Sequence, residues 1–122
     1  KTLFTEVLSK YKKGHRKFEI ASDQFFCPLY VNDLVQIIDI FVKNKIKGLY
    51  NVCGNVCKSR YDLIKFLFDV KMIKNVKLKK CSIKKFDNKL FFPTNLNLSN
   101  KKIKKKISFN FTNLREIIKR LK

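Results

Sequence analysis

Apolar residues recur at helical spacing in four parts of the chain. Side chains at i, i+3, i+4 and i+7 lie on one face of a helix, so such runs predict amphipathic helices that bury that face. The four stretches and their apolar residues are 3–11 (Leu3, Phe4, Val7, Leu8, Tyr11), 33–44 (Leu34, Ile37, Ile38, Phe41), the stretch after Ser59 (Leu63, Ile64, Leu67, Phe68) and the stretch after Thr112 (Leu114, Ile117, Ile118, Leu121).

Small and polar residues mark the ends of these helices. Gly14 is expected to stop the first helix. Asn32 or Asp33 is expected to cap the second, because short polar side chains accept hydrogen bonds from the free N–H groups of a first turn. Ser59 opens a capping-box-like start with Asp in place of the usual Glu, and Thr112 is expected to cap the last helix.

Shorter stretches predict strands. Residues 17–20 alternate between polar and apolar, and 49–53 follow a glycine and are largely apolar, so each predicts one strand. A further strand is expected within 71–90. Pro28 prevents a helix through the middle of 21–31.

The elements together predict a mixed α/β fold. A short basic helix is expected between Ser99 and Ile107, and no Gly/Ser-rich linker separates the elements. We therefore expect one domain over residues 1–122. No stretch approaches the roughly 18 apolar residues of a membrane helix. The chain starts with Lys1 and shows no export signal, so we expect a cytoplasmic protein and a piece of a longer chain.

The chain has 122 residues and a formal net charge of +20. A clustered basic face is the electrostatic signature of nucleic-acid binding. However, only four of the 29 basic residues are arginine, whereas proteins that contact phosphates and bases favour the forked guanidinium. We interpret the lysines as a solvated surface with an attraction for anionic ligands, and we do not expect nucleic acid as the partner.

The four cysteines do not predict a metal site. Cys53 and Cys57 are separated by three residues, where a zinc knuckle usually has two, and the single histidine is His15. Without an export signal, a disulfide framework is not expected either. We therefore expect Cys27, Cys53, Cys57 and Cys81 to be reduced thiols.

Two candidate enzymatic features are weak. Dinucleotide binding needs a glycine-rich turn, and the three glycines, Gly14, Gly48 and Gly54, are too dispersed to form one. Tyr61 and Lys65 have the Tyr-x-x-x-Lys spacing of a proton donor and its activating lysine. Because Tyr61 shares a helical face with Ile64 and Phe68, we interpret it as an aromatic residue at the edge of the core, and we assign no catalytic residue.

A longer set of short motifs follows one order over nearly the whole chain. The motifs are Asp23-Gln24, Pro28, Tyr30-Val31, Asp33-Leu34, Gly48-Leu49-Tyr50-Asn51, Ser59-Arg60-Tyr61, Pro93-Thr94-Asn95 and Leu98. No single motif is specific, but their order resembles that of a known family, the dTDP-4-dehydrorhamnose reductase branch of the extended short-chain dehydrogenases.

The resemblance implies the C-terminal, substrate-side portion of a Rossmann-type enzyme. In the family, the loop that corresponds to residues 24–30 lines the sugar pocket, so the candidate substrate-binding residues are Gln24, Phe26, Pro28 and Phe92. Related epimerases carry a phosphate-binding arginine at the position of Phe26, which favours the reductases. The reductase pattern itself has Gly at position 26 and Arg at position 92, so the sugar is left open.

The resemblance also implies the cofactor and the partners. A parent reductase would bind NADP or NAD through an N-terminal Rossmann half that supplies the catalytic Tyr and Lys, and it would transfer hydride to the keto-sugar of a nucleotide sugar. A homodimer of the parent enzyme is a further expectation. Two alternatives stay open: a non-catalytic relative, such as the regulatory subunit of methionine adenosyltransferase, and a basic nucleic-acid-binding module. Fold resemblance alone does not decide between them.

Overall fold

The structure is a computed structural model that describes residues 2–86 and 93–121. In chain order its elements are α1 (Leu3–Lys12), β1 (Lys17–Ala21), β2 (Phe25–Phe26), α2 (Val31–Lys43), β3 (Lys58–Ser59), α3 (Arg60–Val70), β4 (Lys77–Cys81), the 3-10 helix η1 (Ile83–Lys85), β5 (Asn95–Leu96), α4 (Lys101–Lys106) and α5 (Leu114–Arg120). This mixture of helices and short strands is the α/β class that the sequence predicts.

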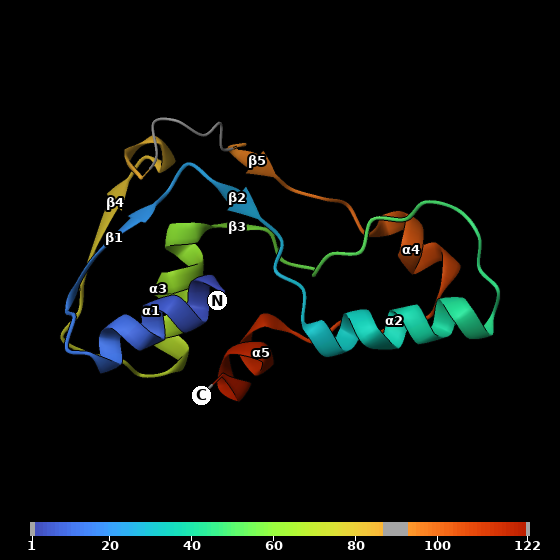
Figure 1. Ribbon diagram of the computed structural model, residues 1–122, viewed down its shortest axis with the longest axis horizontal. Coiled ribbons are helices and arrows are strands. Elements are labelled where there is room, and N and C mark those ends of the chain that lie inside the picture. Colours follow the sequence, from blue (N-terminus) through green and yellow to red (C-terminus); the bar gives the residue numbers. More distant parts are fainter. Residues whose placement is uncertain (1, 87–92, 122) are drawn as a thin grey trace.

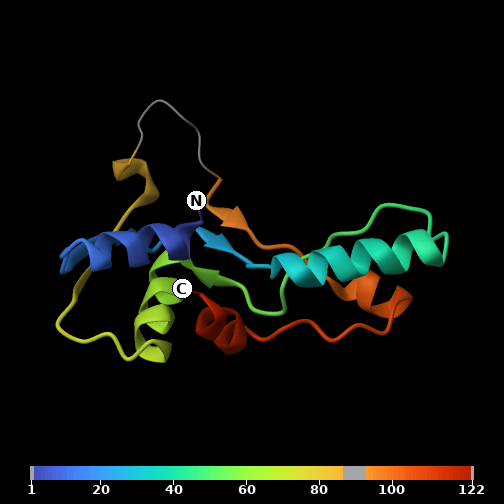
Figure 2. The same ribbon diagram turned by 60° about the horizontal axis from the view of Figure 1, so that its bottom comes forward.

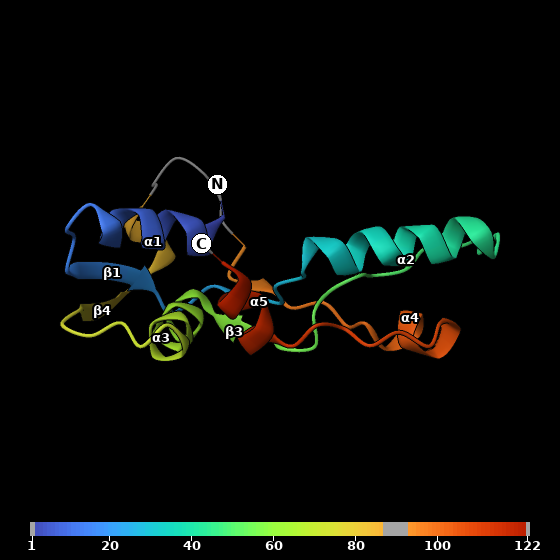
Figure 3. The ribbon, with the colours of Figure 1, turned by 90° about the horizontal axis from the view of Figure 1, so that it is seen from below.

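The molecule is elongated, with different elements at its two ends (Figure 1). Helices α1 and α3 lie with β1 and β4 at one end, whereas α2 and α4 form the other. The short strands β2, β3 and β5 lie between them, and α5 returns toward α1 and α3. The view from below shows the same division (Figure 3), and Figure 2 shows both termini near the middle of the molecule.

The first hydrophobic core lies at the α1/α3 end. The apolar faces of these two helices and of α5 meet the inward side chains of β1, where the rings of Phe18 and Phe68 pack edge to face with centroids 5.7 Å apart. The periodicity of the sequence therefore identifies this core correctly. Its buried residues are Phe4, Val7, Leu8, Phe18, Ile20, Leu63, Ile64, Leu67, Phe68, Leu114 and Ile118.

A smaller second core lies between α2 and α4. Ile37 of α2 meets Ile103, Ile107 and Phe111 from the C-terminal part of the chain. The ring of Tyr50 packs edge to face against the ring of Phe41 in α2, with centroids 5.2 Å apart. Ile103 is thus the buried residue of the basic helix α4, whose lysines are exposed.

The strands form two small sheets. Parallel strands β1 and β4 pair from Lys17 with Lys77 to Ala21 with Cys81, which confirms both predicted strands. In the second sheet, β2 is central, antiparallel to β3 and parallel to β5. These two-residue strands are too short to show a pattern in the sequence, and none of them was predicted.

Three local predictions are wrong. Helix α2 begins at Val31, and neither Asn32 nor Asp33 caps it, because the Asp33 carboxylate binds Thr112 instead. Residues 49–53 form no strand, since no other described segment pairs with them. Helix α5 is capped by Asn113, whose side-chain oxygen accepts the N–H of Glu116 at 2.9 Å.

Candidate functional site

The loop between β1 and α2 carries three of the four candidate substrate residues, Gln24, Phe26 and Pro28. It leaves the first core, passes through the short central sheet and enters α2 at the other end of the molecule (Figure 1). The fourth candidate, Phe92, lies outside the described residues. The loop is held in place by five different kinds of contact.

Asp23 and Gln24 anchor the start of the loop. The Asp23 carboxylate accepts hydrogen bonds from the Ser82 hydroxyl at 2.5 Å and the Ile83 N–H at 2.7 Å. These two bonds lower the pKa of the Asp23 carboxyl below its usual value. Gln24 is buried, and its amide nitrogen donates to the Pro93 carbonyl at 2.9 Å. Gln24 therefore positions the loop, and its buried Oε1 has no hydrogen-bond partner.

Phe26 lies in β2 and is held by strands on both sides. It pairs with Lys58 of β3 and Leu96 of β5. Directly after β3, the N–H of Arg60, the first residue of α3, donates to the Gln24 carbonyl at 3.0 Å. The Arg60 guanidinium lies over the Phe26 ring, with Cζ 6.0 Å from the ring centroid. The sequence predicts a substrate-binding role for Phe26 only, whereas the structure places the Arg60 side chain against it.

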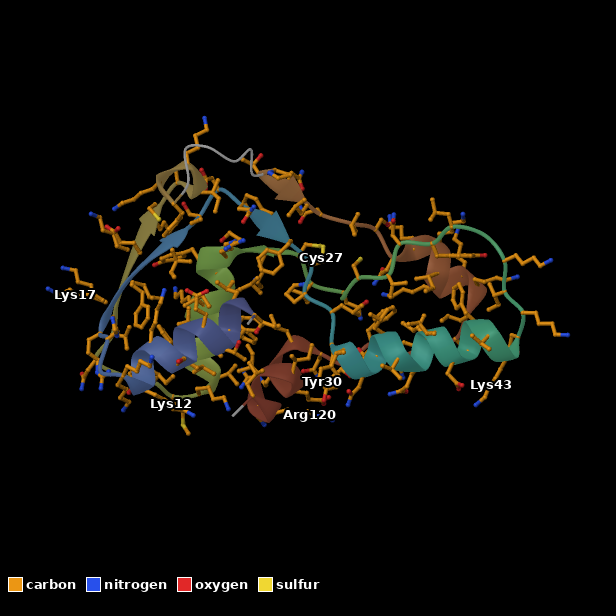
Figure 4. The ribbon with its side chains drawn as sticks, viewed as in Figure 1. Lys12, Lys17, Cys27, Tyr30, Lys43 and Arg120 are labelled. Atoms are coloured by element: carbon orange, nitrogen blue, oxygen red, sulfur yellow. A yellow bond between two sulfur atoms is a disulfide. The ribbon has the colours of Figure 1, made fainter. Side chains whose placement is uncertain are left out.

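A disulfide joins Cys27 to Cys57, which corrects the expectation of four reduced thiols. The bond ties the loop to the segment that leads into β3, and the yellow sulfur pair is visible beside the Cys27 label in Figure 4. Cys53 and Cys81 are free, as expected. Burial raises the pKa of both thiols, and Cys53 donates to the Leu98 carbonyl at 3.2 Å.

Gly54 permits the close approach of Pro28. A Cβ atom at position 54 would lie 1.9 Å from the Pro28 carbonyl oxygen, so any other residue would force the two backbones apart. The requirement is steric, since this glycine has no positive φ. The sequence gives no signal for the contact, because it joins segments that lie far apart along the chain.

Tyr30 fixes the end of the loop to the C-terminal helix. The Arg120 guanidinium lies over the Tyr30 ring at 5.4 Å, and its Nη1 donates to the phenol oxygen at 3.5 Å. Figure 4 shows the two side chains together where α5 meets the start of α2. The hydrogen bond to Tyr30 raises the pKa of Arg120.

Other candidates lie elsewhere. Tyr61 packs at the edge of the first core, with the Lys80 ammonium 5.0 Å from its ring centre, which confirms its interpretation as a core-edge aromatic. Within residues 2–86 and 93–121 there is no cluster of three or more His, Cys, Asp or Glu side chains that could hold a metal. No helix in these ranges is long and apolar enough to cross a membrane.

The fold is shared with solved reductases. A dTDP-4-dehydrorhamnose reductase from Bacillus anthracis, crystallised with NADP, superposes with a TM-score of 0.79 at 19% identity, over 96% of this chain and 41% of that one. A dTDP-4-dehydrorhamnose reductase from Clostridium acetobutylicum superposes with a TM-score of 0.71 at 23% identity, over 80% of this chain and 34% of that one. The Yersinia enterocolitica reductase superposes with a TM-score of 0.65 at 15% identity, over 70% of this chain and 30% of that one. The architecture is thus that of one part of these reductases, and the chain spans less than half of their length.

The sequence family gives the more specific assignment. The profile of the RmlD substrate binding domain matches residues 1–122, the whole chain. The chain belongs to this family, which confirms the resemblance drawn from the residues. No curated protein matches it by sequence.

Proposed function

We propose that this chain forms the substrate-binding portion of an NAD(P)-dependent sugar-nucleotide reductase, an extended short-chain dehydrogenase that transfers hydride to a keto-sugar. The observation that supports it most is the match of the RmlD substrate binding domain over residues 1–122. The anchored loop from Gln24 to Tyr30 is the part that would close over the sugar.

The cofactor would be bound elsewhere in such an enzyme. The three glycines lie on separate segments, and a Rossmann phosphate site needs several of them in one turn. NADP accompanies one of the similar reductases, which favours NADP over NAD for a parent enzyme. The chain itself would supply neither the glycine turn nor the catalytic Tyr and Lys.

One surface fits a missing cofactor-binding half. Helix α2 turns Ile37 into the second core, where it is 2% exposed, but Ile38 on the next face is 53% exposed. An apolar stripe of this kind marks a surface that a partner covers. We propose that the Rossmann half of the parent enzyme covers it. The stripe consists of Val31, Leu34, Val35, Ile38 and Val42.

Two finer proposals concern the cell and the assembly. We propose a cytoplasmic location, in which the Cys27–Cys57 bond would meet a reducing thiol pool. We also propose that the parent enzyme forms a homodimer.

Calorimetric titration of the chain with dTDP-glucose and with NADPH tests the proposed function. We expect saturable binding of the nucleotide sugar that is weakened when Pro28 or Phe26 is changed to Ala, and no saturable binding of NADPH. A matched control, Val42→Ala on the exposed face of α2, should bind like the unchanged chain. Preferential binding of NADPH would contradict the proposal.

A further inference from the structure

One arginine of this chain, Arg60, is partly buried, and one nitrogen of its guanidinium has no hydrogen-bond partner. The Nε of Arg60 is shielded from solvent and forms no hydrogen bond. The guanidinium also forms no ion pair with any described carboxylate. By contrast, Arg16 donates to two carbonyls and Arg120 to a phenol oxygen. A buried donor that has lost water and gained no acceptor is costly, so the Nε–H of Arg60 calls for an explanation.

Arg60 lines the wall of a cleft of about 560 Å³. The cleft lies between α1, β1 and η1, and volumes of this order are typical of small-molecule sites. Arg60 borders the candidate substrate loop, because its N–H donates to the Gln24 carbonyl and its guanidinium lies over Phe26. Arg60 therefore contacts both the cleft and the loop that is expected to bind the substrate.

The carboxylates of the cleft are already engaged. Glu6 pairs with Lys10 at 2.6 Å, and Glu19 pairs with Lys79 at 3.4 Å and also with Lys85. Asp62, in the first turn of α3, accepts the Ser59 hydroxyl at 2.6 Å. The remaining cation on this wall, Lys17, lies at the outer edge of the molecule (Figure 4). Of the cations that line the cleft, Arg60 is the one that also contacts the substrate loop and forms no ion pair with a described carboxylate.

We propose that Arg60 binds the diphosphate group of the substrate in this cleft, an inference that rests on the proposed function and extends it to one residue. A guanidinium presents a planar fork of N–H donors that matches two phosphate oxygens, and such charge-assisted pairs are among the strongest hydrogen bonds in proteins. The Phe26 ring holds the guanidinium from one face by a cation–π contact and leaves its terminal nitrogens for the ligand.

Titration with inorganic pyrophosphate, followed by calorimetry, tests the role of Arg60. We expect Arg60→Gln to weaken binding about tenfold or more, in line with the strength of a hydrogen bond between charged groups. The affinity of Arg60→Lys for pyrophosphate should lie between those of the unchanged chain and Arg60→Gln, because lysine keeps the charge but lacks the planar fork of donors. The matched control is Arg115→Gln. Like Arg60, Arg115 lies near the start of a helix and over a phenylalanine ring, with its Cζ 5.8 Å from the Phe66 ring centroid. This variant should bind like the unchanged chain.

NMR of the Arg60 Nε–H group in the unchanged chain provides a second test that does not depend on whether the variants fold. The Nε–H resonance of Arg60 should shift as pyrophosphate is added, and an unmoved resonance would overturn the proposal. If dTDP-glucose binds but Arg60→Gln leaves its affinity unchanged, this inference fails and the proposed function stands. If pyrophosphate and dTDP bind through Arg60 but dTDP-glucose binds no better than dTDP, the role of Arg60 in diphosphate binding stands and the proposed sugar-nucleotide function fails.

Discussion

Asp33 and Thr112 lie 79 positions apart in the sequence and are joined by two hydrogen bonds. The Thr112 N–H donates to one carboxylate oxygen at 2.8 Å and its hydroxyl to the other at 2.7 Å. Asp33 is 3% exposed, so the pair is shielded from water. It connects the first turn of α2 to the residues just before α5 and thereby fixes the C-terminal end of the substrate loop.

Replacing Asp33 by Ala should destabilise the chain. The change leaves the Thr112 N–H and hydroxyl without an acceptor, and such a loss costs about 1–3 kcal/mol in free energy of unfolding. Asp39→Ala is the matched control on the same helix, because its salt bridge with Lys43 is exposed and contributes less than about 1 kcal/mol. Urea denaturation measures both, and equal losses would contradict the role of Asp33.

Gly54→Ala should displace the substrate loop. The new methyl group would meet the Pro28 carbonyl at 1.9 Å, so the backbones must separate. We expect a lower melting temperature and shifted amide resonances for residues 27–30. Gly14→Ala serves as the comparison, since position 14 has a positive φ but nothing within 4 Å of the added atom, and its effects should remain near the end of α1. Unshifted 27–30 resonances in Gly54→Ala would refute the close contact.

Reduction of the Cys27–Cys57 bond should lower stability by about 2–4 kcal/mol, because the open chain gains conformational freedom when unfolded. Thermal melting with and without a dithiol reductant measures the change. The Cys27→Ser variant should show no response to the reductant. Alkylation of the unfolded, unreduced chain should label two cysteines, Cys53 and Cys81. Four labelled cysteines would show that the bond does not form.

Acid should weaken the link between β1 and η1. Hydrogen bonds from Ser82 and Ile83 lower the folded pKa of Asp23 below its usual 3.8, and bonds from Lys85 and Lys79 lower that of Glu19 below 4.5. A depressed carboxyl pKa stabilises the folded chain above the unfolded value, and this stability is lost as pH falls through the folded value. Urea unfolding at falling pH should show the loss below about pH 4.5. Asp23→Asn should be less stable at neutral pH and lose less on acidification; an unchanged profile would contradict this.

The sequence predicted the elements that carry their own periodicity. Helices α1 and α3 and strands β1 and β4 were all expected, because their apolar residues recur at 3.6 or 2 positions. What it could not predict depends on contacts between distant segments. The disulfide from Cys27, the approach of Gly54 to Pro28 and the binding of Asp33 to Thr112 each join residues far apart in the chain.

The candidate site follows the same division. Gln24 and Phe26 were identified through an ordered resemblance, and the structure adds that Gln24 is buried and holds Pro93. In the sequence, Arg60 appeared only as part of the Ser59-Arg60-Tyr61 motif, and no role was predicted for it. Its position over Phe26 becomes evident only once β2 and β3 are paired.

The most direct test of the substrate-binding role is to map the binding site of dTDP-glucose on the chain by amide NMR. We expect the shifted resonances to cluster at residues 24–30 and at Arg60, with little change in the lysine-rich helix α4. Shifts concentrated on the α4 lysines would indicate a general attraction of anions by a basic surface. That result, or the absence of any shift at the 24–30 loop, would contradict a substrate-binding role for this loop.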